Sequence, residues 1–208
     1  MKCVPVLHRA IAAALLLLAA GCGSSPPVRY YTLAADQSLA KAEVSESPAG
    51  AYAVAVGPVT VPAAVDRPQL VVQVAPNRVA LLDDQRWAEP LNRGIPRAIA
   101  SDLAGLLGVP TVMFPQDSLA DVKYRVAIEI RSFISVPSEA ATVEASWTVF
   151  GPHDAVKRGQ LLAREPVKDG GYDALAAAHG RALMRISHEV AATIRSEETG
   201  RSEARSGQ

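Results

Sequence analysis

The sequence predicts a single α+β domain with a mostly antiparallel sheet and two main helices packed on it. Several short β-rich runs alternate apolar with polar residues, as strands with one buried face do. Two longer stretches instead repeat apolar residues every three or four positions, which is helical spacing. Because the strands come in neighbouring runs with two separated helices, we expect an α+β domain rather than alternating βαβ units.

The N-terminus, MKCVPVLHRAIAAALLLLAAGCGSS, has the pattern of a secretory signal. Lys2 and Arg9 precede an unbroken apolar run, Ala10–Ala20, which is far shorter than the roughly 20 residues that span a bilayer. The run leads into LAAGC, a lipobox typical of bacterial lipoproteins. We therefore predict a signal peptide over residues 1–21, cleaved between Gly21 and Cys22. The alternative is an ordinary secretory signal that a cysteine follows by chance.

Cys22 is the predicted lipidation site, because a thiolate is the nucleophile that accepts a diacylglyceryl group. Two or three acyl chains, at about 0.8 kcal/mol per buried CH₂, would hold the protein stably on a membrane. Gly23 follows in place of the Asp that commonly retains lipoproteins at the inner membrane, so we expect the outer membrane of a Gram-negative bacterium. Cys3 leaves with the signal, so no disulfide forms within one mature chain.

Composition excludes several classes of partner. The formal charge of +0 becomes about −2 once Lys2 and Arg9 leave with the signal, and no basic cluster stands out, which argues against nucleic acid. Aromatic residues make up only 5%, too few for a platform that stacks bases or sugars. The mature chain is long enough for one domain with its own core.

The domain is expected over residues 28–196, after a tether at 22–27. Val28–Leu33 reads as a first strand, and 36–50, which lacks bulky apolar residues, as a mobile loop. Ala51–Pro62 alternates like a strand, with a bulge or bend at Gly57-Pro58.

A short hairpin is expected next, from two β-rich runs separated by Ala75-Pro76-Asn77. The runs are Gln69–Val74 and Arg78–Leu82. The acid pair Asp83-Asp84 is interpreted as the turn that follows, because neighbouring residues on a strand point to opposite faces and could not cooperate in chemistry.

The first helix should begin at Pro90, since proline suits the first turn, and end at Gly108. Its apolar stripe is Leu91, Ile95, Ile99, Leu103 and Leu106. Pro96 should kink the helix or delay its regular start.

The rest of the chain should supply further strands and the second helix. The strand candidates are Val109–Phe114, the alternating runs around Tyr124–Ile130 and Val143–Val149 as antiparallel neighbours, and Gln160–Val167. The helix, Tyr172–Ser196, carries a stripe of Leu175, His179, Leu183, Ile186, Val190 and Ile194. Residues 197–208 are expected to form a disordered polar tail.

No catalytic motif, metal site or cofactor site is predicted. His179 and His188 are nine residues apart and do not share a helix face as zinc ligands do. His179 is better explained as a packed core histidine than as a ligand, and His153 as an exposed residue of a hairpin turn. No nucleophile elbow, Walker loop or dinucleotide fingerprint occurs. We therefore expect a protein that is not an enzyme.

Several segments together resemble a known family. They are YYTL, VAVGPVTVPAAVDRPQLVVQV, NRVALLDDQRWAEPLNRGIPRAIASDLAGLL, YRVAIEIRSF and VEASWTVF, following a lipobox. The chain from about Tyr30 to Ile194 resembles the PqiC/YmbA-type lipoproteins, also described as auxiliary lipoprotein components of ABC-type transport systems. The most specific pieces are DRPQLV (Asp66–Val71) and RWAEPL (Arg86–Leu91).

The resemblance implies a non-enzymatic part in the traffic of lipids or small hydrophobic molecules across the envelope. Its implied partners are a periplasmic MCE-domain protein, which forms a tunnel, and inner-membrane transport subunits. The lipoprotein would sit on the periplasmic face of the outer membrane at the tunnel mouth, and a ring-like homo-oligomer is one arrangement that the resemblance implies. The alternative is a periplasmic lipid-binding carrier, or another envelope-assembly lipoprotein, which would need an internal apolar pocket.

The two specific motifs supply the candidate interface, Asp66, Arg67, Trp87 and Glu89. One hypothesis is structural: Trp87 packs at the helix start, Glu89 favours the positive end of the helix dipole, and Arg67 pairs with an acid such as Glu89. The other makes both loops a docking face, since tryptophan and arginine are favoured interface anchors. Catalysis is a third and weaker interpretation.

Overall fold

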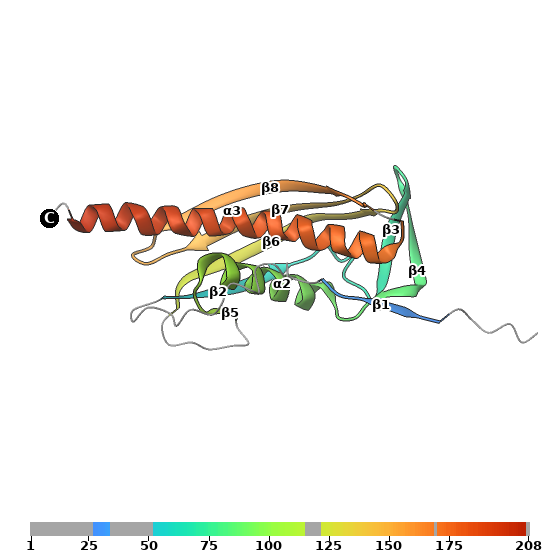
Figure 1. The fold of residues 1–208 in the computed structure, drawn as a ribbon, viewed down its shortest axis with the longest axis horizontal. Coiled ribbons are helices and arrows are strands. Elements are labelled where there is room, and N and C mark those ends of the chain that lie inside the picture. Colours follow the sequence, from blue (N-terminus) through green and yellow to red (C-terminus); the bar gives the residue numbers. More distant parts are fainter. Residues whose placement is uncertain (1–26, 34–51, 115–121, 169, 207–208) are drawn as a thin grey trace, which may run out of the picture.

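A computed structural model describes residues 27–33, 52–114, 122–168 and 170–206, and side chains as far as residue 200. The predicted signal peptide with Gly21, the predicted lipidation site Cys22 and the predicted loop 36–50 lie outside the described residues. Within the described part the chain forms two β-sheets and two helices (Figure 1).

The larger sheet has five strands in the order β5-β2-β6-β7-β8. The bounds are β2 Ala53–Thr60, β5 Thr111–Met113, β6 Val122–Val136, β7 Ala140–Phe150 and β8 Val156–Pro166. β6, β7 and β8 pair antiparallel, as their alternation predicts. β2 lies parallel to both β5 and β6. The sheet is therefore mixed, because the chain crosses back after β2, so that β5 and β6 run in the same direction as β2.

The smaller sheet has three strands in the order β1-β4-β3. The bounds are β1 Arg29–Tyr31, β3 Gln69–Ala75 and β4 Arg78–Trp87. β3 and β4 form the predicted hairpin, while β1 runs parallel to the end of β4.

The predicted turn at Asp83-Asp84 is wrong, because both residues belong to β4. The register shows why the local signal misleads. Leu82 pairs with Leu70 but Arg86 pairs with Gln69, so the residues between them form an irregularity in a strand that continues. Pairing of β1 with Gln85–Trp87 keeps the end of β4 extended.

Both helices pack on one face of the larger sheet, and α3 runs along it in Figure 1. α2 spans Leu91–Leu107, contains Pro96, and ends at Gly108, which adopts the left-handed conformation expected of a helix C-cap. α3 spans Tyr172–Ser206. The whole α3 stripe from Leu175 to Ile194 is at most 1% exposed, as are Leu91, Ile95, Ile99 and Leu103 of α2, so the two helical patterns are confirmed.

The predicted disordered tail at 197–208 is wrong as far as Ser206, because α3 continues through it. Glu197 lies 3.1 Å from Lys157 of β8, and Glu198 lies 2.7 Å from Lys123 of β6. These ion pairs hold the helix against the sheet beyond the end of the apolar stripe, where the sequence pattern loses its signal.

Two local backbone features, a bulge in β2 and the turn between β7 and β8, lie where the sequence predicts them. The register of β2 against β6 shifts between Val56 and Val59, so Gly57-Pro58 is a bulge. His153 lies in the turn between β7 and β8 with a positive φ of 57°, as the hairpin interpretation expects.

Candidate functional site

The loop before β3 meets the segment before α2, so the two most specific sequence motifs touch each other. The Trp87 amide donates to the Pro68 carbonyl oxygen at 2.7 Å. Asp66 accepts hydrogen bonds from the Asn92 backbone N–H at 3.2 Å and from the Asn92 side-chain amide at 3.0 Å. Pro90, the residue at the N-cap of α2, offers no capping side chain. The carboxylate of Asp66 therefore caps the helix from a distant loop.

Trp87 lies in the core with only 6% of its surface exposed. Its ring meets Phe133 of β6 and His179 of α3 edge-on, each at 6.1 Å between centroids. These contacts tie the end of the small sheet to the large sheet and to α3. A side chain so buried offers a partner little surface.

Glu89 and Arg67 do not form the ion pair that the structural hypothesis for Trp87 includes. Glu89 packs against Gly94 and forms an ion pair with Arg97 at 3.0 Å, within one face of the α2 N-terminus. The Nε atom of Arg67 is buried and makes no hydrogen bond among the described residues. Asp66, Arg67 and Glu89 thus lie around one junction but have separate roles.

His179 is a core histidine, as predicted. It is fully buried, stacks on Phe133 at 3.8 Å between ring centroids, and shares a 2.7 Å hydrogen bond with the hydroxyl of Ser135. Burial lowers the pKa of His179 to about 3, so the ring is neutral near pH 7. A catalytic Ser–His pair would have a carboxylate on Nδ1, but that atom is buried with no hydrogen-bond partner among the described residues.

A groove of about 420 Å³ lies beside the junction. We call it the hairpin groove: it runs between the outer face of the β3–β4 hairpin, the loop after β2 and the end of β6. No sequence motif marks this groove, although the alternation within β3 and β4 gives the hairpin a second face. Its lining residues are Pro62, Ala64, Val65, Arg67, Val71, Gln73, Val79, Leu81, Arg131, Ser132, Phe133, Ile134 and Ser135.

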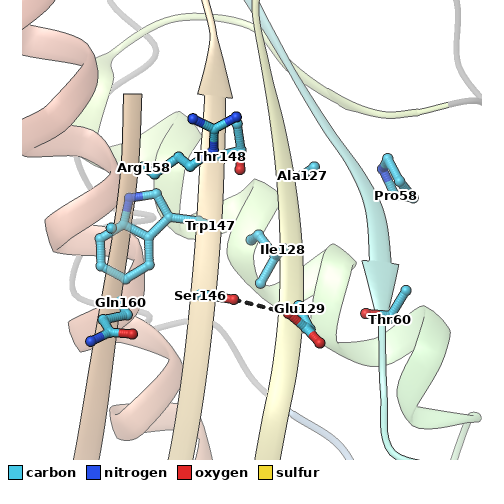
Figure 2. A pocket seen from close by; sticks show the side chains of 11 residues that line it. Pro58, Thr60, Ala127, Ile128, Glu129, Ser146, Trp147, Thr148, Arg158 and Gln160 are labelled. Atoms are coloured by element: carbon cyan, nitrogen blue, oxygen red, sulfur yellow. Dashed lines mark hydrogen bonds between the residues drawn. The ribbon is translucent and has the colours of Figure 1, made fainter. Parts of the chain in front are cut away.

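A second hollow, of about 550 Å³, lies on the face of the large sheet that the helices leave open. Figure 2 shows polar side chains from neighbouring strands across it, with both helices behind the sheet. Ser146 donates to Glu129 at 3.2 Å, while Arg158 and Gln160 extend from β8. The lining also includes Pro58 and Thr60 of β2 and two residues that belong to the core, Ile128 and Trp147.

The described part of the chain contains no group of three or more His, Cys, Asp or Glu side chains placed to hold a metal ion. Nor does any described helix have the length and apolarity needed to cross a membrane.

Comparison with known proteins identifies relatives by family and fold. The family model for ABC-type transport auxiliary lipoprotein components matches residues 31–191. No curated protein matches the chain.

Two solved structures share the fold. The crystal structure of an uncharacterized protein is 16% identical, with a TM-score of 0.65, covering 81% of this chain and 99% of the other. A protein of the DUF330 family from Xanthomonas campestris is 17% identical, with a TM-score of 0.54, covering 81% of this chain and 85% of its own. Because the family model spans nearly the whole described domain, the chain belongs to the family of ABC-type transport auxiliary lipoprotein components.

Proposed function

We propose that this lipoprotein is a non-enzymatic adaptor that tethers the periplasmic tunnel of an MCE-type transport system to the outer membrane. Acylation at Cys22, after cleavage at the Gly21–Cys22 bond, would anchor it to the periplasmic face. Inner-membrane transport subunits would stand at the far end of the tunnel, and the cargo would be lipids or small hydrophobic molecules. Membership of an auxiliary lipoprotein family of ABC-type transport supports this role and a place in the bacterial cell envelope.

One observation favours the adaptor role over that of a carrier with an internal cavity: side chains fill the space between the large sheet and the helices. Leu91, Ile95 and Ile99 of α2 are at most 1% exposed, and so are Leu183 and Ile186 of α3. These side chains belong to one continuous hydrophobic cluster with the inner face of the sheet. A carrier of the kind considered from the sequence would need that space for its ligand.

The proposed docking face is the loop junction, with Asp66, Arg67 and Glu89 at or near the surface. Trp87 lies beneath it and positions the end of β4 rather than contacting the partner directly. A homo-oligomer of the lipoprotein could present several copies of this face around a tunnel mouth.

The test is chemical crosslinking of the acylated protein in native envelopes, followed by affinity recovery, with Cys22→Ala as the unanchored control. We expect recovery of an MCE-domain protein with the wild type and its loss with Cys22→Ala. Recovery of the lipoprotein alone with bound lipid would contradict the adaptor role and favour the carrier.

A pair of matched variants tests the docking face in the same experiment. Arg67→Ala should lower partner recovery, because it removes an arginine at the junction. Arg164→Ala removes an arginine from the β8 edge strand, where it pairs with Glu139 at 2.7 Å, and should leave recovery unchanged. Equal recovery with both variants would show that the junction is not the docking face.

A further inference from the structure

The hairpin groove presents apolar side chains to solvent on a surface that the fold itself does not cover. Val79 and Leu81 of β4 are 56% and 45% exposed, and Ile134 of β6 is 37% exposed. Val71 pairs with Leu81 across the hairpin, so their side chains lie on the same face. Phe133 also lines the groove. Covering these side chains would remove apolar surface from water, which favours an apolar occupant.

The charged residues that line the groove are all positive. Its lining residues include two arginines, Arg67 and Arg131, and no acid. Arg131 makes only long ion pairs, at 3.9 Å to Glu129 and 3.8 Å to Glu144. Arg67 has no ion pair among the described residues, and its Nε atom is buried without a hydrogen-bond acceptor. Because the lining carries two guanidinium groups and no carboxylate, the groove favours a ligand with an anionic group.

We propose that the hairpin groove binds a single-chain amphiphile with an anionic headgroup, the acyl chain lying along Val71, Val79, Leu81 and Ile134 and the headgroup on Arg67. The volume of about 420 Å³ falls within the usual range of small-ligand sites. A protein partner would need about 800 Å² of its own surface buried, more than a groove of this size provides. The proposal deepens the proposed function and rests on it only for the source of the ligand.

The experiment uses the full acylated chain, purified into phosphatidylcholine vesicles that contain palmitate with a photoactivatable group at the end of its chain. After illumination, mass spectrometry locates the crosslinked residues. We expect crosslinks within 71–81 and 133–134, competed by unlabelled palmitate. Hexadecyltrimethylammonium, which has the same chain length but a cationic head, should compete at least about tenfold more weakly, because the charge-assisted hydrogen bonds are lost.

Three variants separate a site from adventitious partitioning. Arg67→Gln should lower the groove crosslinks about tenfold, the effect of losing one hydrogen bond to a charged group. Leu81→Glu should abolish these crosslinks, because it places a negative charge in the groove where the acyl chain of the anionic ligand would lie. Leu162→Glu makes the same change on β8, where Leu162 is 59% exposed, and should have no effect. Unchanged urea midpoints for all three confirm that the fold is kept.

Crosslinks that spread along the chain, or equal competition by the cationic amphiphile, would overturn the proposal. So would a Leu81→Glu variant that labels normally yet no longer recovers a protein partner, since the groove would then be a protein interface. The vesicles contain no transport partner, so the photolabelling tests only amphiphile binding. A negative result in the envelope experiment would therefore not affect the groove proposal, and a negative photolabelling result would not affect the adaptor role.

Discussion

Among the single residues of the two specific motifs, Asp66 caps a helix and Trp87 packs in the core. Both therefore have a structural role, whether or not a partner also binds at the junction. Asp66 lies 26 positions before the helix residue that it caps, and it binds both the backbone and the side chain of Asn92. No acid lies in the first turn of α2, so this carboxylate also supplies the negative charge that the helix dipole favours.

Replacing Asp66 with alanine should lower the free energy of unfolding by about 1 kcal/mol, the usual effect of losing a helix cap. Asp83→Ala is the matched control: this aspartate is exposed on β4, and its loss should change stability by less than about 0.5 kcal/mol. Urea denaturation followed by circular dichroism measures both. Equal effects of the two variants would rule out the capping role.

His179 should make stability depend on pH. Its pKa is about 3 in the folded chain, below the ordinary value of 6.5, so between these values the unfolded chain binds the extra proton. Stability should therefore fall as the pH drops below 6.5, by at most about 1.4 kcal/mol per pH unit. In His179→Gln, which cannot titrate, urea unfolding between pH 4 and 6.5 should show a shallower slope. An unchanged slope would mean that other groups dominate the acid sensitivity.

Among the strands of the large sheet, β7 and β8 are joined by a close contact between a tryptophan and a glycine. Trp147 of β7 is opposite Gly159 of β8, and its indole ring covers the glycine so closely that an added Cβ would overlap it. The glycine thus has a packing role in a strand where its flexibility would otherwise weaken the sheet.

Gly159→Ala should destabilise the protein by about 1–3 kcal/mol, because the ring of Trp147 must move within a packed core. Gly170→Ala, where an added Cβ would meet open space, should be close to neutral. Thermal unfolding of both variants tests this difference. A neutral Gly159→Ala would show that the indole shifts without cost.

At the scale of the whole molecule, Trp87 joins parts that are distant in sequence. It ends β4 of the small sheet and contacts Phe133 of the large sheet and His179 of α3. Its backbone also bonds to Pro68, in the loop that carries Asp66. These contacts link the small sheet and the loop that carries Asp66 to the large sheet and to α3.

Trp87→Ala should lower the free energy of unfolding by about 3–5 kcal/mol, as expected for removing a large buried aromatic side chain. Val79→Ala, on the exposed face of the same strand, should change it by far less. Guanidinium denaturation followed by the fluorescence of Trp147 provides the measurement. A Trp87→Ala protein of wild-type stability that loses its partner would instead support direct docking.

The amino-acid pattern alone predicts the α+β class, the two helices and most strands, because burial of one face imposes a period of 3.6 or 2 on apolar residues. It also determined that His179 is a core residue, since the stripe Leu175–Ile194 places it on the buried face.

Other features depend on contacts that form only in the folded domain. Asp83-Asp84 resembles a turn, yet pairing with β1 extends β4 past it. The polar segment after Ser196 has no apolar stripe, yet Lys157 and Lys123 hold it as helix. Asp66 forms hydrogen bonds with Asn92, and Trp87 is buried in the core. Arg67 lines the hairpin groove and does not pair with Glu89. Each of these outcomes depends on contacts between residues far apart in the chain, and local patterns carry no information about such contacts.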